Sequence, residues 1–271
     1  MSEQKRSGSG VLAALRWKGR AHWVLTLFPD AREASGVWQK SGAAGAVEPS
    51  EGGPDTERSQ AEAGRRAQVR IRRYCAANRL NRLGTLTYAG DGQHDPEELR
   101  EQVAAFFRRL RAGIGGNTLP LRHGIKRGDP FPYLWVPQWH PGGHGLHAHF
   151  AVGRFIPRGL IERSWGRGFV HIKQLNGLPV GSGELGEARL AARYLAGYAG
   201  RDLGDERRPA GLHRYEVAQG FQPDKILCYG ESAEGAIETA SRVMGSEPER
   251  VWLSSSVEGW RGPPACWAQW N

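Results

Sequence analysis

The chain of 271 residues is poor in cysteine and has no long apolar run, and both shortages narrow its class. Its three cysteines, Cys75, Cys228 and Cys266, are far apart and form no C-x-x-C pair. This spacing indicates a reducing, cytoplasmic chain without a disulfide framework or a zinc finger. No apolar stretch approaches ~18 residues, so we expect no membrane span. The short apolar patch near the N-terminus is broken by Arg16, which is unlike a signal peptide.

The sequence also lacks the G-x-x-x-x-G-K-[ST] motif that binds nucleotide phosphates. A helicase activity associated with this chain would therefore have to come from another protein. Acidic residues are outnumbered, because 37 Lys and Arg face 28 Asp and Glu, which gives a formal charge of +9. Arginine supplies nearly all of the positive charge, and guanidinium groups pair well with phosphate, so a polyanion is the expected partner.

Composition along the chain predicts three regions. Residues 1–57 form a flexible N-terminal region, and within it residues 30–57 are rich in Gly, Ala, Ser, Pro and Glu without hydrophobic periodicity, as a linker is. Residues 58–230 form the main domain. Residues 231–271 contain a C-terminal helix and a Trp-rich tail.

Strand and helix patterns alternate in the main domain without a glycine-rich fingerprint between them. Leu83–Tyr88 reads as a strand, and Asp95-Pro96 reads as a helix start with an N-cap residue followed by Pro. A long helix is expected over Glu184–Leu203. This order predicts an α+β fold, with a central, mostly antiparallel sheet on which helices pack.

The stretch from Trp135 to Phe150 carries four of the nine histidines. In a strand, His147 and His149 would point to one face while the apolar residues between and beside them point to the other. Two imidazoles so placed can share one metal ion, although the pair alone does not identify the metal and is also compatible with a solvated strand face. His140 and His144 lie in the preceding Pro-Gly-Gly loop and are more typical of solvated residues, while Trp139 is a candidate for base stacking.

Two further patterns are compatible with chemistry or with plain structure. Tyr194 and Tyr198 are four residues apart on the second long helix and therefore share one face, where they could simply pack on the sheet. A run of arginines over residues 65–82 is either a solvated helix face or a phosphate-contacting surface. The candidate DNA-contacting residues are Arg70, Arg72, Arg73, Arg193 and Arg201.

Taken together, three stretches resemble the motifs of the HUH (histidine–hydrophobic–histidine) endonucleases that initiate rolling-circle replication. They are Thr85-Leu86-Thr87-Tyr88, His147-Ala148-His149 and Tyr194-x-x-x-Tyr198, in this order, within roughly residues 70–230. The resemblance is to the replication-associated proteins of bacterial plasmids and single-stranded DNA phages. It implies sequence-specific DNA nicking and strand transfer on single-stranded or origin DNA, with a separate helicase and polymerase.

The resemblance also implies roles for individual residues. His147 and His149 would hold a divalent cation, Mg²⁺ or Mn²⁺, and a tyrosine would form a 5′-phosphotyrosine link. The family usually has an acidic third ligand where this chain has Gln138, whose uncharged oxygen should hold the ion less tightly. The family's helix often has a lysine before the second tyrosine, where Gly197 stands here, and Arg193 or Arg201 is expected to contact the phosphate instead.

Three functions remain open at this point. The leading one is the nickase, with Tyr194 expected to attack first and Tyr198 to act in transfer, because Tyr194 is expected to have more packing neighbours and Tyr198 more open space. The second is a non-catalytic origin-binding or regulatory protein on the same fold. The third is a metal-dependent hydrolase that uses water, although acidic residues for a two-metal site are lacking near the histidines.

Overall fold

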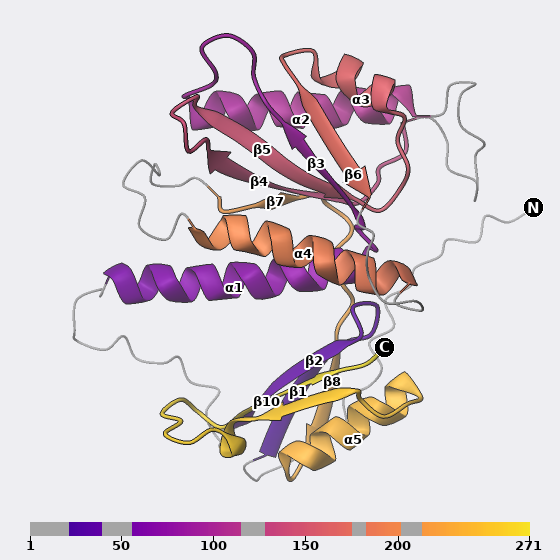
Figure 1. Cartoon of the computed structure of the whole chain (residues 1–271). Coiled ribbons are helices and arrows are strands. Elements are labelled where there is room, and N and C mark those ends of the chain that lie inside the picture. Colours follow the sequence, from indigo (N-terminus) through magenta and orange to yellow (C-terminus); the bar gives the residue numbers. More distant parts are fainter. Residues whose placement is uncertain (1–21, 40–55, 115–127, 175–182, 202–212) are drawn as a thin grey trace, which may run out of the picture. The chain divides into compact units, whose positions relative to one another are not determined.

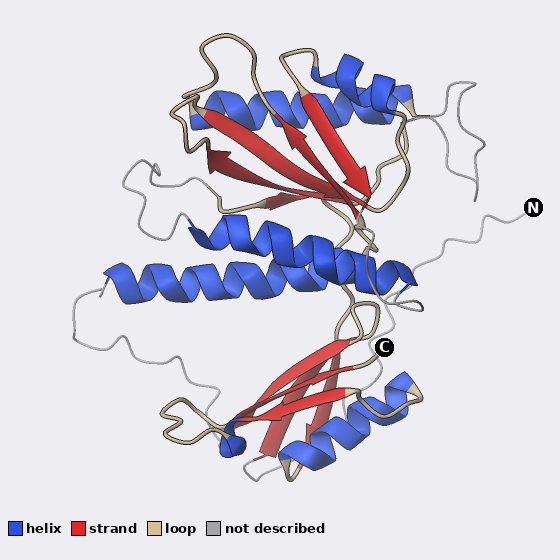
Figure 2. Ribbon diagram, viewed as in Figure 1, coloured by secondary structure: helices blue, strands red, loops and turns tan. Residues whose placement is uncertain are grey.

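The structure, a computed structural model, describes residues 22–39, 56–114, 128–174, 183–201 and 213–271. Within these ranges it contains five α-helices and two five-stranded antiparallel sheets, so the predicted α+β class is confirmed (Figures 1 and 2). The chain divides into two compact units. An internal unit covers residues 50–223, and a terminal unit combines residues 1–49 with residues 224–271.

The sheet of the internal unit has the strand order β6-β3-β5-β4-β7, and all of its neighbours pair antiparallel. Its strands are β3 (Arg82–Leu86), β4 (Tyr133–Trp139), β5 (Leu146–Val152), β6 (Val170–Gln174) and β7 (Glu216–Val217). The central position of β5 puts the histidine strand between β3 and β4, where both of its edges are hydrogen-bonded. Side chains on β5 are therefore held by two neighbouring strands.

Helices cover both faces of this sheet, as the alternation of its side chains requires (Figure 1). Helices α2 (Pro96–Gly113) and α3 (Arg158–Trp165) contribute to a core that includes Ala148 and Phe150 of β5. Helices α1 (Thr56–Ala77) and α4 (Gly183–Arg201) pack beside each other on a second core with Val136 and Ala151. Because His147 and His149 share the strand parity of Ala151, they face the side of α1 and α4.

Helix α2 begins where the sequence predicts. Asp95 adopts an extended backbone, and its Oδ1 accepts hydrogen bonds from the backbone N–H groups of Glu97 at 2.8 Å and Glu98 at 3.4 Å. These bonds satisfy two of the amide groups that a helix leaves free in its first turn. The cap fixes the start of the helix whose Phe106 and Phe107 pack against Phe150.

The terminal unit has a sheet of order β8-β1-β2-β10-β9, with helix α5 (Ala233–Met244) packed on it. Its strands are β1 (His22–Phe28), β2 (Glu33–Gln39), β8 (Ile226–Gly230), β9 (Arg250–Leu253) and β10 (Ala265–Gln269). The 3₁₀ turn Ser254–Ser256 follows β9. Leu25, Leu27 and Trp270 are fully buried in the core of this unit.

Two predicted boundaries differ from this arrangement. Strand β2 lies inside the segment predicted as a linker, and β8 lies inside the segment predicted as the main domain. The sequence Glu33–Gln39 contains Ala34, Ser35 and Gly36, so its hydrophobic alternation is weak. Gly36 is nevertheless required there, because a Cβ atom would lie 2.6 Å from the carbonyl oxygen of Val24 on β1.

The predicted C-terminal region, residues 231–271, contains helix α5 as expected and also β9 and β10. Strand β9 pairs with β10, and β10 pairs with the N-terminal strand β2, so segments from both ends of the chain form one sheet. Pairing between segments this distant in sequence leaves no local pattern. Within the described ranges, no helix combines the length and the apolar content that a bilayer crossing requires.

Candidate active site

Three polar side chains meet on the hairpin of β4 and β5. Gln138 lies directly opposite His147 in the strand register, and His149 follows two residues later on the same face. The Nε2 atoms of the two histidines are 2.9 Å apart, and the Oε1 atom of Gln138 lies 3.2 Å from that of His147 and 2.7 Å from that of His149. We call Gln138, His147 and His149 the donor triangle.

The dimensions of the donor triangle fit one side of an octahedral metal site. Ligands at about 2.1 Å from an ion, at right angles to each other, are separated by about 3 Å, and the three measured separations lie on both sides of that value. Two imidazole nitrogens and one amide oxygen suit several divalent ions. Among the described residues, no group of three His, Cys, Asp or Glu side chains forms a metal-binding set, so the third donor is an amide and not a carboxylate.

The protonation of His147 favours ligation. Burial, with a smaller contribution from the neighbouring His140, lowers the pKa of His147 to about 4. The imidazole is therefore neutral near pH 7 and keeps a lone pair for a metal ion. Its Nδ1 atom is buried and has no hydrogen-bond partner among the described residues.

The hydroxyl group of Thr85 orients the second imidazole. Thr85 on β3 lies opposite His149 on β5, and its Oγ1 is 3.1 Å from His149 Nδ1. A proton on Nδ1, donated to this hydroxyl, leaves Nε2 free to act as a ligand, as outer partners of metal-binding histidines commonly arrange. Thr85 belongs to one of the three sequence motifs, but only the strand register reveals this contact.

Helix α4 brings Tyr198 against the donor triangle. Its ring is parallel to the imidazole of His149, with the ring centroids 3.8 Å apart and the planes 1° apart. Tyr194, one turn earlier, is 50% exposed, whereas Tyr198 is half-buried. The expectation that Tyr194 is the more closely packed of the two is therefore wrong, because the face of α4 that carries Tyr198 turns towards β5.

The predicted DNA-contacting arginines do not form one surface. Arg70 and Arg193 are exposed, while Arg72 and Arg73 are half-buried. Arg201 ends α4, and its side chain lies outside the described part of the chain. The segment over residues 65–82 is thus divided between exposed positions and positions that face neighbouring elements.

The loop histidines have local roles. The backbone N–H of Gly142 donates to His140 Nδ1 at 3.0 Å, and His144 Nε2 lies 3.2 Å from the carbonyl oxygen of Tyr88. The ring of His140 is 5.8 Å from that of His147, at the border of the donor triangle. Trp139 is half-buried, and its ring lies 6.3 Å from that of His94.

Comparison with known proteins gives one match. Residues 81–203 match a family of replication-associated proteins, the ORF2 type. This part of the chain is Rep-like. The matched segment contains the donor triangle, Thr85 and both tyrosines of α4, and it ends before the terminal strands β8–β10. No curated protein and no solved structure matches the chain.

Proposed function

We propose that the Rep-like unit nicks DNA and transfers the cut strand through a 5′-phosphotyrosine intermediate, and so initiates rolling-circle replication of a plasmid, phage or integrated element. The observation that carries the proposal is the stack of Tyr198 on His149, which puts a phenol beside the donor triangle. A nucleophile beside a candidate metal site is the arrangement that covalent phosphoryl transfer needs.

His147, His149 and Gln138 would hold a divalent cation, Mg²⁺ or Mn²⁺. When bound, the ion would neutralise negative charge on the scissile phosphate. The chain's own contribution is to present three unprotonated donor atoms in one place, which the low pKa of His147 and the contact between Thr85 and His149 support. The amide of Gln138 should make the site weaker than one with a carboxylate.

Tyr198 is the proposed first nucleophile, because it stacks on a candidate ligand while Tyr194 is exposed. Its phenolic oxygen forms a bond to phosphorus as the bond from phosphorus to the 3′ oxygen breaks. The phenol loses its proton to solvent, and the released oxygen takes up a proton to become a 3′-OH. Tyr194 would attack the second phosphate in the transfer step, because it lies one turn away on the same helix.

The expected DNA is single-stranded or locally opened at an origin. The chain's net charge of +9 and the exposed Arg70 and Arg193 favour binding to phosphates. Because the sequence lacks a nucleotide-binding motif, a separate helicase would open the duplex, and a separate polymerase would extend the 3′-OH.

The test is adduct formation with single-stranded origin DNA from the parent element in the presence of Mn²⁺, followed on a denaturing gel. We expect a covalent protein–DNA band in the wild type, its loss in Tyr198→Phe, and a band that persists in Tyr194→Phe while strand transfer fails. A band that survives in the double variant would place the nucleophile elsewhere. Cut DNA without any adduct would indicate a hydrolase instead.

Gln138 also supports a second candidate, a DNA-binding origin or regulatory protein that has lost catalysis. An uncharged third donor is what the loss of metal-dependent chemistry would leave at this position. In the same assay this protein would retard the DNA without cutting it, with or without Mn²⁺.

A further inference from the structure

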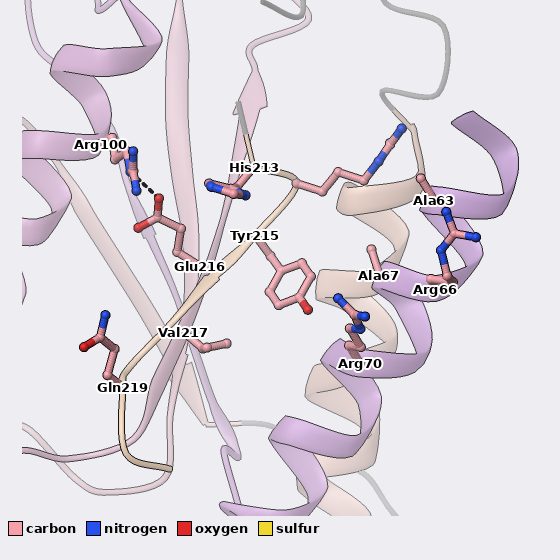
Figure 3. A pocket seen from close by; sticks show the side chains of 11 residues that line it. Ala63, Arg66, Ala67, Arg70, Arg100, His213, Tyr215, Glu216, Val217 and Gln219 are labelled. Carbon is pink, nitrogen blue, oxygen red and sulfur yellow. Dashed lines mark ion pairs between the residues drawn. The ribbon is translucent and has the colours of Figure 1, made fainter. Parts of the chain in front are cut away.

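A second site lies in the internal unit, in a pocket of about 700 Å³ between α1 and β7 (Figure 3). Four arginines line it: Arg66, Arg70, Arg100 and Arg214. Glu216 is the only acidic side chain among the lining residues, so the wall carries a clear excess of positive charge. A pocket of this size and charge is suited to a phosphate-bearing ligand.

Two of these arginines are available to a ligand. Arg66 makes an exposed ion pair with Glu62 at 3.3 Å, one turn away on the same helix, and such a pair contributes little stability. Arg70 is exposed, and no ion pair of its side chain occurs among the described residues. Arg100, by contrast, is ion-paired with Glu216.

The surface of α1 is built to let a ligand approach. Arg66 and Arg70 are four residues apart, so they share one face with about 5–6 Å between their Cβ atoms. Ala63 and Ala67 also line the pocket, and their small side chains leave room between the arginines. Two guanidinium groups at this spacing can contact successive phosphates of one strand.

The opposite wall carries an aromatic ring. Tyr215 precedes the two residues of β7, which pair with Leu134 and Trp135 of β4. Figure 3 shows its ring reaching from this strand towards α1 and Arg70. An aromatic side chain beside arginines is the combination with which proteins bind single-stranded nucleic acid, by stacking a base and pairing its phosphates.

The pocket is connected to the candidate active site through Arg214. Its Nη1 donates to the carbonyl oxygen of Ala199 at 3.3 Å, and Ala199 is the residue after Tyr198. The basic wall and the proposed nucleophile are therefore held by the same turn of α4. A strand lying in the pocket would run close to the tyrosine.

We propose that this pocket binds the single-stranded DNA that flanks the nicked phosphate, with Arg66 and Arg70 on its phosphates and Tyr215 stacked on a base. This site deepens the proposed function and rests on it for the identity of the strand. The pocket sets the position of the strand relative to Tyr198, so Arg66, Arg70 and Tyr215 are positioning residues.

The experiment measures binding without catalysis. Fluorescence anisotropy of a labelled single strand of about 20 nucleotides, with the full chain in EDTA, gives the Kd at several salt concentrations. We expect Arg66→Gln/Arg70→Gln to raise the Kd about tenfold and to lower the salt slope by about 1.4, the loss of two phosphate contacts. The control Arg65→Gln/Arg108→Gln removes the same charge from exposed positions outside the pocket and should lower the slope by less than half as much.

Tyr215 is tested by a pair of substitutions. Tyr215→Phe keeps the ring and should bind like the wild type, whereas Tyr215→Leu should raise the Kd about tenfold by removing the stack. Thermal unfolding of both variants checks that the packing of the residue is retained. Equal losses in the two arginine pairs, or wild-type binding by Tyr215→Leu in a folded protein, would overturn the proposal.

Two further readings identify the ligand and separate this proposal from the proposed function. Displacement of the labelled strand by dAMP as readily as by unlabelled strand would assign the pocket to a free nucleotide and reject the strand. Binding with the expected pattern but no adduct in Mn²⁺ would retain the pocket and reject the nickase. Normal adduct formation together with equal losses in the two arginine pairs would do the reverse.

Discussion

The hydroxyl group of Thr85 lies 3.1 Å from Nδ1 of His149, across the pairing of β3 with β5. Thr85→Val keeps the shape of the side chain and removes this contact, so the imidazole loses the partner that selects its tautomer. We expect the affinity for Mn²⁺ to fall about tenfold, as measured by titration of the purified protein with the metal.

Thr87→Val is the matched control for this variant. The hydroxyl of Thr87 donates to the carbonyl oxygen of Phe169 at 3.1 Å and does not contact the donor triangle. Metal affinity should remain at the wild-type value. A fall of equal size in both variants would mean that the sheet, and not the imidazole, had been disturbed.

Gln138→Glu should strengthen metal binding. The substitution keeps an oxygen beside both Nε2 atoms and adds a negative charge, which divalent ions of this class favour. Nicking should then reach half its maximum at a Mn²⁺ concentration about tenfold lower, as measured by the yield of covalent adduct across a metal titration. An unchanged metal requirement would show that residue 138 is not a ligand.

Gly84→Ala should destabilise the internal unit. Gly84 lies opposite Phe150, and a Cβ atom there would be 2.2 Å from the phenyl ring, so the ring or the strand must move. We expect a loss of about 1–3 kcal/mol in the free energy of unfolding, measured with urea. Gly159→Ala in α3 is the control, because the nearest atom is the flexible end of Arg163 at 3.2 Å. It should leave stability unchanged or raise it by up to about 1 kcal/mol.

Asp95→Ala should cost about 1 kcal/mol of unfolding free energy, because it removes the side chain that caps α2. Asp95→Asn offers an equivalent acceptor oxygen and should remain within a few tenths of a kcal/mol of the wild type. Equal losses in the two variants in urea unfolding would show that the charge, and not the hydrogen bonds, stabilises the helix start.

Local patterns are sufficient for much of the internal unit. The alternation of Leu146, His147, Ala148 and His149 predicts which residues share a face, and the register of β4 with β5 places Gln138 opposite His147. The same is true of the cap at Asp95, since all of its partners lie within one turn. Where a side chain is oriented by its near neighbours in sequence, the pattern is enough.

Contacts between distant segments could not be predicted in this way. The contact of Thr85 with His149 depends on which strands are neighbours, and the stack of Tyr198 depends on how α4 is rotated against the sheet. The pocket beside Tyr215 requires a strand of only two residues, and such a strand has no periodicity. The small residues of β2 likewise conceal a strand whose partners are β1 and β10.

The terminal unit has a consequence for the order of folding during synthesis. Strands β1 and β2 are made first, but β8 and β10, which pair with their outer edges, are made after the whole internal unit. A two-stranded hairpin is marginal alone in water, so Leu25 and Leu27 stay without their final core until the last strands leave the ribosome. The internal unit, by contrast, is continuous in sequence and can fold while its terminal partner is still incomplete.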